Sequence, residues 1–202
     1  MARERKKDII RKQLLEQGIK MFVNQGYHGT GIQEVVDNVG IPKGSFYNYF
    51  ESKENFGSEV IKAYSEQFKS LLSDILAESE NNAFNAIRIF FDVLIKRFEE
   101  KRCREGCLVG NLAAEISDNS EIGRKTISVC INEWKDIIAE VIRRGQKQKR
   151  IRADIKPDKC ADFLVNSIEG YVLRMKIESN TKPIRDLKAL FLQYISTKNS
   201  NQ

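Results

Sequence analysis

Residues 40–50 read Gly-Ile-Pro-Lys-Gly-Ser-Phe-Tyr-Asn-Tyr-Phe and predict a tight turn followed by a short helix. Gly40 can adopt the positive φ that such a turn needs, and Pro42 prevents a preceding helix from continuing. Phe46 and Phe50 are four residues apart, so both can face a core. The opposite face then consists mainly of hydrogen-bond donors and flat rings, on Lys43, Gly44, Ser45, Tyr47, Asn48 and Tyr49.

Two further helices are expected before this turn. An apolar stripe at helical spacing predicts a helix over residues 8–24, ending at Gln25-Gly26, and consists of Leu15, Ile19 and Phe22. Thr30 has the chemistry of an N-cap, and Gln33 lies where its capping-box partner belongs, so a second helix is expected to start there. Two short helices joined by a glycine-containing turn and supported by a longer helix form a helix-turn-helix.

The second helix of a helix-turn-helix can enter the major groove of DNA. The donors on its outward face suit phosphate oxygens and base edges, and Gly44 removes a side chain where the helix must approach the duplex. Lys53 adds a cation just beyond it. Structural packing alone, or a dimer surface for the tyrosines, is the alternative. The six cations between Arg3 and Lys12 either add affinity for the DNA backbone or belong to a solvated chain end.

The rest of the chain is also expected to be helical. Between Pro42 and Pro157 no proline interrupts the sequence, and apolar residues recur with a period near 3.6. Pro157 and Pro183 suit the first turns of the last two helices. The prediction is an all-α chain of about nine helices without strands.

Composition limits the function. The chain has 202 residues, one histidine and four cysteines without CxxC spacing, so a Cys/His zinc site is poorly supplied and neither a metal nor a cofactor is expected. Hydrolase, NTPase and dehydrogenase motifs are absent, so an enzyme is disfavoured. Neither a membrane span nor a signal peptide is visible, which predicts a cytoplasmic protein. The net charge of +6 is weak evidence for DNA, because residues 1–55 hold nine Lys and Arg against seven Asp and Glu.

The sequence resembles the TetR family of transcriptional repressors between residues 8 and 64. The resemblance rests on Phe22-x3-Gly26-Tyr27, Thr30-x4-Val35 and the run from Gly40 to Glu54. It implies a helix-turn-helix at about 31–50 within a DNA-binding domain of residues 8–66. A larger domain, residues 67–198, would bind a small ligand and form a homodimer through the last two helices. The implied partner is a palindromic double-stranded operator, which the inducer releases.

The resemblance also implies which residues touch DNA. The implied phosphate contacts are Thr30, Ser45, Tyr47, Tyr49 and Lys53, and the implied base contacts are Gln33, Lys43, Gly44 and Tyr47. Gly31 and Val36 depart from the family pattern, which usually has Ser or Thr and Ala there, so Gly31 could contact phosphate only through its backbone.

In the second domain the candidates for sensing are less specific. Phe91 and Trp134 are candidate pocket walls, with ordinary core packing as the alternative. Cys107 follows a helix-breaking glycine near Arg102 and Arg104, which favours a reactive thiolate, and Cys103 could be its resolving partner. The segment from Gly106 to Asp118 resembles a TetR subgroup in which such a cysteine is linked to sensing of electrophiles or oxidants. A buried, inert thiol is the alternative.

A basic run, residues 143–152, has six cations and no acid. A solvated loop is one interpretation, and an anionic ligand or partner is the other. The sequence as a whole predicts a repressor that an inducer, or modification of a cysteine, releases from DNA. An activator or nucleoid protein without an inducer response, and a helical enzyme or carrier, are the alternatives.

Overall fold

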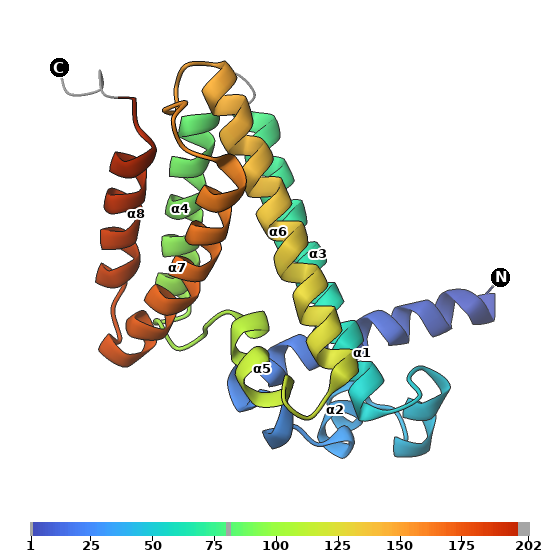
Figure 1. Cartoon of the computed structure of the whole chain (residues 1–202). Helices are drawn as coiled ribbons and strands as arrows, with labels where there is room; N and C mark the ends of the chain where they lie inside the picture. Colours follow the sequence, from blue (N-terminus) through green and yellow to red (C-terminus); the bar gives the residue numbers. More distant parts are fainter. Residues whose placement is uncertain (1, 80–81, 198–202) are drawn as a thin grey trace. The chain divides into compact units, whose positions relative to one another are not determined.

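The computed structural model describes residues 2–79 and 82–197, and within them most of the chain is helical (Figure 1). Eight α-helices and one 3₁₀ helix and no strand are found in this part of the chain, which confirms the all-α prediction. The helices are α1 (Ala2–Gly29), α2 (Ile32–Val39), the 3₁₀ helix η1 (Lys43–Asn48), α3 (Lys53–Glu78), α4 (Ala83–Glu100), α5 (Leu108–Ile116), α6 (Glu121–Lys147), α7 (Pro157–Glu178) and α8 (Lys182–Ile195).

The helices divide into two compact units. The first unit holds the chain up to Gln67 together with Cys107–Cys130, and the second holds Phe68–Gly106 together with the chain from Ile131 onward. Two of the boundaries therefore fall inside α3 and α6, and the third lies between α4 and α5. Residue 198, the predicted end of the second domain, lies outside the described residues.

The first unit is built on α1, which extends further than the predicted helix at both ends. At Gly26 the backbone leaves the helix, with φ 74° and ψ 177°, and one more turn follows up to Gly29. The core beside it is aromatic: Phe22 and Phe56 pack edge to face at 5.8 Å, and Phe56 lies 5.3 Å from Phe46. This cluster fixes α1, η1 and α3 against one another.

The predicted capping box at Thr30 is wrong. The N-cap of α2 is Gly31, which has extended backbone angles and no side-chain cap. The Thr30 hydroxyl donates instead to the carbonyl of Gly26 at 2.8 Å, and Gln33 donates to Asp37 at 2.7 Å. The physical reason is the break at Gly26, which leaves an accessible carbonyl one turn before Thr30.

The helix α5 and the first part of α6 complete the first unit. The hydroxyls of Ser58 in α3 and Thr126 in α6 share a buried hydrogen bond of 2.7 Å. The hydroxyl of Ser120 caps α6 by accepting from the N–H of Gly123 at 2.9 Å and also donates to Glu54. Ser120 is therefore the N-cap residue of α6.

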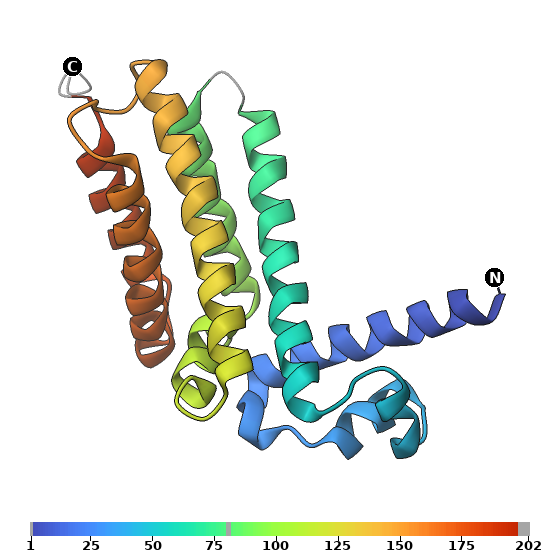
Figure 2. The same cartoon turned by 45° about the vertical axis from the view of Figure 1, so that its right-hand side comes forward.

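The second unit is a bundle of the remaining helical segments. In it α7 and α8 lie side by side, as both views show (Figures 1 and 2), and Pro157 and Pro183 occupy their first turns as predicted. Between α3 and α6, Phe68 packs on Trp134 with ring centroids 4.6 Å apart. Lys69 pairs with Glu133 at 2.9 Å on the same two helices.

The basic run at residues 143–152 is an ordered helix end and turn rather than a loose loop. The N–H groups of Arg150 and Ile151 both donate to the carbonyl of Gly145, at 2.9 and 3.1 Å. The side chain of Gln146 donates to the carbonyls of Arg152 and Ile155 at 3.0 and 2.9 Å. Ile151 is buried and closes this end of the second unit.

Candidate nucleic-acid interface

The turn between α2 and η1 has the backbone that the sequence predicts. Gly40 lies in the left-handed region, with φ 74° and ψ 35°, and its N–H donates to the carbonyl of Asp37. The N–H of Ile41 reaches the carbonyl of Val36 at 3.1 Å, the long bond of a Schellman motif. Pro42 is extended, and its carbonyl accepts from the N–H of Ser45, which starts the next helical turn.

This next helix is 3₁₀ and ends at Asn48, two residues earlier than the α-helix predicted to run to Phe50. Phe46 and Phe50 are nonetheless both buried, at 0% and 2% exposure, as their spacing predicts. Their rings lie 5.4 Å apart. The two phenylalanines thus anchor the segment and orient its opposite face outward.

The outward face carries the predicted donors. Tyr47 is 56% exposed, the largest value for an aromatic side chain among the described residues. Lys43, Gly44 and Asn48 are exposed, whereas Ser45 and Tyr49 are half-buried. A Cβ added to Gly44 would meet no atom of this chain within 4 Å, so nothing in the protein itself requires glycine there.

The other predicted DNA contacts differ in accessibility. Gly31 and Gln33 are exposed at the start of α2. Thr30 is only 1% exposed, and its hydroxyl is already bonded to Gly26. The Lys53 ammonium lies 4.5 Å from the centre of the Tyr27 ring, and burial lowers the pKa of this lysine while the charge of Glu115 partly opposes the shift.

A residue that sequence reasoning missed holds the end of α1. The Glu115 carboxylate on α5 accepts from the N–H of Tyr27 at 2.8 Å and from the N–H of His28 at 3.2 Å. The His28 ring in turn contacts the carbonyl of Glu115 at 3.3 Å. Because Gly26 breaks the helix, the N–H groups that follow it lack helical acceptors, and the carboxylate supplies one. We call this contact the Glu115 cap.

The Glu115 cap lies on the same short helix as the candidate sensor cysteine. Cys107 is the N-cap residue of α5, and its carbonyl accepts from the N–H of Asn111 at 2.9 Å. It is half-buried, whereas the other three cysteines are buried, and all four are thiols rather than disulfides. Glu115 lies about two turns after Cys107 along this helix.

Two of the other cysteines are in surroundings that disfavour the thiolate. Cys103 belongs to the second unit, and burial together with the charge of Glu99 raises the pKa of its thiol. Burial raises the pKa of Cys160 to about 11. Both shifts reduce the fraction of thiolate, which is the reactive form.

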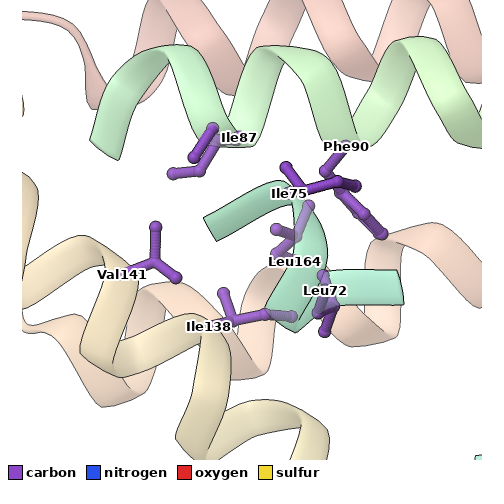
Figure 3. Close-up of a pocket in the computed structure, with 8 residues that line it drawn as sticks. Leu72, Ile75, Ile87, Phe90, Ile138, Val141 and Leu164 are labelled. Carbon is purple, nitrogen blue, oxygen red and sulfur yellow. The ribbon is translucent and has the colours of Figure 1, made fainter. Parts of the chain in front are cut away.

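The second unit contains an apolar cavity (Figure 3). The space open to the centre of a water-sized sphere is about 20 Å³, and all of the empty space, counting the part that opens to solvent, is about 310 Å³. Its walls come from α3, α4, α6 and α7 and consist of Leu72, Ile75, Ala86, Ile87, Phe90, Ile138, Val141 and Leu164. The predicted walls Phe91 and Trp134 are not among these residues. Both are buried, with Phe91 packed on Phe90 and Phe191, and Trp134 on Phe68.

Other kinds of site were also sought in the part of the chain that the structure describes. It contains no group of three or more His, Cys, Asp or Glu side chains placed to hold a metal ion. None of its helices combines the length and the apolar character needed to cross a membrane.

Comparison with known proteins agrees with this geometry. Residues 14–60 match the family model described as bacterial regulatory proteins, tetR family, and residues 83–191 match the one described as tetracyclin repressor-like, C-terminal domain. The chain belongs to the TetR family. Members of this family are DNA-binding transcriptional regulators and not enzymes, and η1 with α2 is its helix-turn-helix.

Named relatives in the TetR family align over most of the chain. The transcriptional repressor DhaR of Mycobacterium sp. is 34% identical over 87% of this chain and 86% of its own length. The repressor NemR of Escherichia coli is 26% identical over 93% of this chain and 94% of its own length. The solved structure of its reduced form superposes with a TM-score of 0.87, covering 94% of this chain and 98% of that one.

A second solved structure, the regulatory protein TetR from Rhodobacter sphaeroides, has a TM-score of 0.85 and 28% identity. It covers 91% of this chain and 97% of that one. The likeness therefore extends over both compact units and not only over the helix-turn-helix.

Proposed function

We propose that this protein is a repressor that binds a palindromic operator as a homodimer and leaves it when an inducer or a cysteine modification acts on it. The observation that carries the proposal is the orientation of η1. Its phenylalanines are buried while Tyr47, Lys43 and Asn48 point away from the core. DhaR and NemR, which align over most of the chain, are both named as repressors.

The contacts with DNA follow from accessibility and chemistry. We assign base contacts to Gln33, Lys43, Gly44 and Tyr47, and phosphate contacts to the backbone of Gly31 and to Ser45, Tyr47, Asn48, Tyr49 and Lys53. Gly44 fits this assignment because the open space beside it would admit the edge of a base pair. Thr30 acts indirectly, since its bond to Gly26 fixes the start of α2.

The same proposal assigns a role to each of the two predicted domains. Residues 8–66 read DNA, and residues 67–198 sense the inducer and dimerise. Five of the nine large apolar side chains that are exposed in the described residues lie on α7 and α8: Phe163, Leu173, Ile177, Leu190 and Tyr194. Apolar side chains concentrated on two adjacent helices fit a self-complementary interface between two copies of the chain. The protein would work in the cytoplasm, with its operator.

Release by cysteine modification is assigned to Cys107. A Michael acceptor would be attacked by the Cys107 thiolate, so that an S–C bond forms while the C=C π bond breaks, and water supplies a proton to the neighbouring carbon. The adduct would displace the start of α5 and with it the Glu115 cap. The relative NemR was solved in a form described as reduced, which fits a thiol-based response in this part of the family.

The test starts by sequencing the genomic fragments that the purified protein retains. On the operator so found, Tyr47→Ala is expected to weaken binding by at least about tenfold, as the loss of one specific contact does. Unfolding free energy should change by no more than about 0.5 kcal/mol, because the side chain is exposed. Lys43→Gln should relax base preference, whereas Lys20→Gln, an exposed cation on α1, should not. Full operator affinity of Tyr47→Ala would refute the orientation of η1.

The sensor is tested separately with N-ethylmaleimide. Wild type should leave the operator on treatment, and Cys107→Ser should stay bound. Equal release of both proteins would remove Cys107 from the mechanism and leave the DNA contacts untouched. A reporter gene under the operator is then expressed in cells that lack the protein. Its transcription rises if the missing protein is a repressor and falls if it is an activator.

A further inference from the structure

A partly buried arginine in the second unit has side-chain nitrogens that lack a partner. The Nε and Nη2 atoms of Arg144, on α6, are buried and have no hydrogen-bond acceptor in the part of the chain that the structure describes. The hydroxyl of Ser79, whose residue is only 6% exposed, is likewise buried without a partner. A buried polar group without a partner destabilises the folded protein, and a charged one does so more strongly.

Both groups follow a residue of the cavity wall by about one helical turn. Arg144 follows the lining residue Val141 by three positions on α6, and Ser79 follows the lining residue Ile75 by four, with its N–H bonded to the carbonyl of Ile75 at 3.1 Å. Residues at these spacings share a helix face. This spacing places each polar group one helical turn beyond a residue of the apolar walls, on the side of its helix that faces the cavity.

The same end of α6 faces the start of α4. The side-chain oxygen of Gln148, four residues after Arg144, accepts from the N–H of Ala83 at 2.9 Å. A Cβ added to Gly145 would lie 3.3 Å from that of Ala83. The end of α6 therefore packs against the start of α4, a helix that also contributes to the cavity wall.

Neighbouring arginines in the basic run have acidic partners. Arg143 pairs with Glu140 at 2.9 Å and also with Asp158, and Arg152 pairs with Asp154. Arg144 pairs with no carboxylate of the described residues. The other cations of the run raise the positive potential around it, which would favour an incoming anion.

We propose that Arg144 and Ser79 bind the anionic head group, carboxylate or phosphate, of a ligand whose aliphatic tail fills the cavity. The guanidinium nitrogens would donate to the head-group oxygens, and the hydroxyl of Ser79 would donate to a third acceptor position. The tail would contact only hydrocarbon, since all eight lining residues are apolar. The proposal names the inducer class of the proposed repressor, and only the effect on the operator rests on that function.

The binding test uses protein without DNA. Octanoate, octyl phosphate and 1-octanol share one tail, and isothermal titration calorimetry gives the affinity of each. At least one of the two anions is expected to bind at least about tenfold more tightly than the alcohol, and the better anion identifies the head group. Equal affinity for all three probes, or no binding of any, overturns the proposal.

Variants locate the site. Arg144→Gln should lose at least about tenfold in affinity for the anion and keep its affinity for 1-octanol. Without ligand it should melt about 2–4 °C higher than wild type, because a guanidinium with two buried, unpartnered nitrogens has been removed. Arg150→Gln, an exposed cation of the same run, is the matched control and should change neither value. Unchanged anion affinity in Arg144→Gln overturns the assignment.

A gel shift with the octanoate-bound protein distinguishes failure of the anion site from failure of the proposed repressor function. Binding of the anion without release of the operator keeps the site and refutes its role as an inducer site. If N-ethylmaleimide releases the operator but no anion binds, the repressor function is supported and the anion site is refuted.

Discussion

The Glu115 carboxylate accepts a hydrogen bond of 2.8 Å from the backbone N–H of Tyr27, which comes 88 residues earlier in the chain. Tyr27 follows the break in α1 and precedes the start of α2, so this bond fixes the entrance to the helix-turn-helix. Since Cys107 begins the helix that carries Glu115, one rigid element joins the candidate sensor to the candidate DNA contacts.

Glu115→Ala should lower the unfolding free energy by about 1–2 kcal/mol, because two backbone donors lose a charged acceptor at a partly exposed position. Operator affinity should fall as well. Urea denaturation and an operator titration measure the two effects. Glu115→Gln should recover part of both, since its amide oxygen can still accept. Glu121→Ala removes an exposed carboxylate of the same unit and is the control; a loss as large as that of Glu115→Ala would argue against the cap.

Gly26→Ala should be more damaging than its size suggests, with a loss of about 2–4 kcal/mol in unfolding free energy. The residue has a φ of 74°, which alanine rarely adopts, and a Cβ there would overlap the Glu115 carboxylate. Gly29→Ala is the matched control in the same helix, where the nearest atom to an added Cβ lies at an ordinary 3.5 Å. Thermal melting that ranks the two variants equally would contradict the role of Gly26.

Leu173→Glu and Leu190→Glu should convert a dimer into a monomer. These side chains are 60% and 56% exposed on α7 and α8, and a buried carboxylate at an apolar interface would lack a partner. Light scattering coupled to gel filtration gives the mass. Ile122→Glu changes a side chain on α6 that is 50% exposed and should leave the dimer intact. If both variants dimerise with unchanged affinity, the dimer interface does not consist of α7 and α8.

The cysteines should react with iodoacetamide in a fixed order. At pH 8 a thiol with a pKa of about 11 is thiolate in only about one molecule in a thousand, so Cys160 should react slowly. Its rate should rise with pH until the pH reaches that pKa. Cys107 is half-buried and should react first. Mass spectrometry of digested samples taken over time gives each rate, and equal labelling of Cys107 and Cys160 at pH 8 would contradict the assignment.

Local chemistry explains which parts of the fold the sequence could predict. The turn at Gly40 and Pro42, the buried pair Phe46 and Phe50, and the prolines that open α7 and α8 each depend on neighbours within a few residues. The capping box failed although it is also local, because the break at Gly26 offered the Thr30 hydroxyl a better acceptor. Propensity rules describe regular helices and do not include such a break.

The remaining features depend on residues that are distant in the chain. Nothing in the segment around Glu115 identifies the N–H groups of Tyr27 and His28 as its donors. Helical periodicity also predicted apolar faces that include Phe91 and Trp134. It could not predict that these side chains fill their space while the walls from Leu72 to Leu164 leave a cavity. The sequence also could not predict that two side-chain nitrogens of Arg144 lack a partner, because their surroundings depend on the tertiary structure.

The two-segment composition of the first unit has a consequence for synthesis on the ribosome. Residues up to Gln67 emerge first, but the partners of Tyr27 and Ser58, which are Glu115 and Thr126, belong to the later segment Cys107–Cys130. About sixty further residues must therefore be synthesised before the nascent helix-turn-helix can form its long-range contacts. A protein truncated after Gln67 would lack both partners. A protein in which a short linker joins Gln67 to Cys107 and the chain ends at Cys130 would retain them.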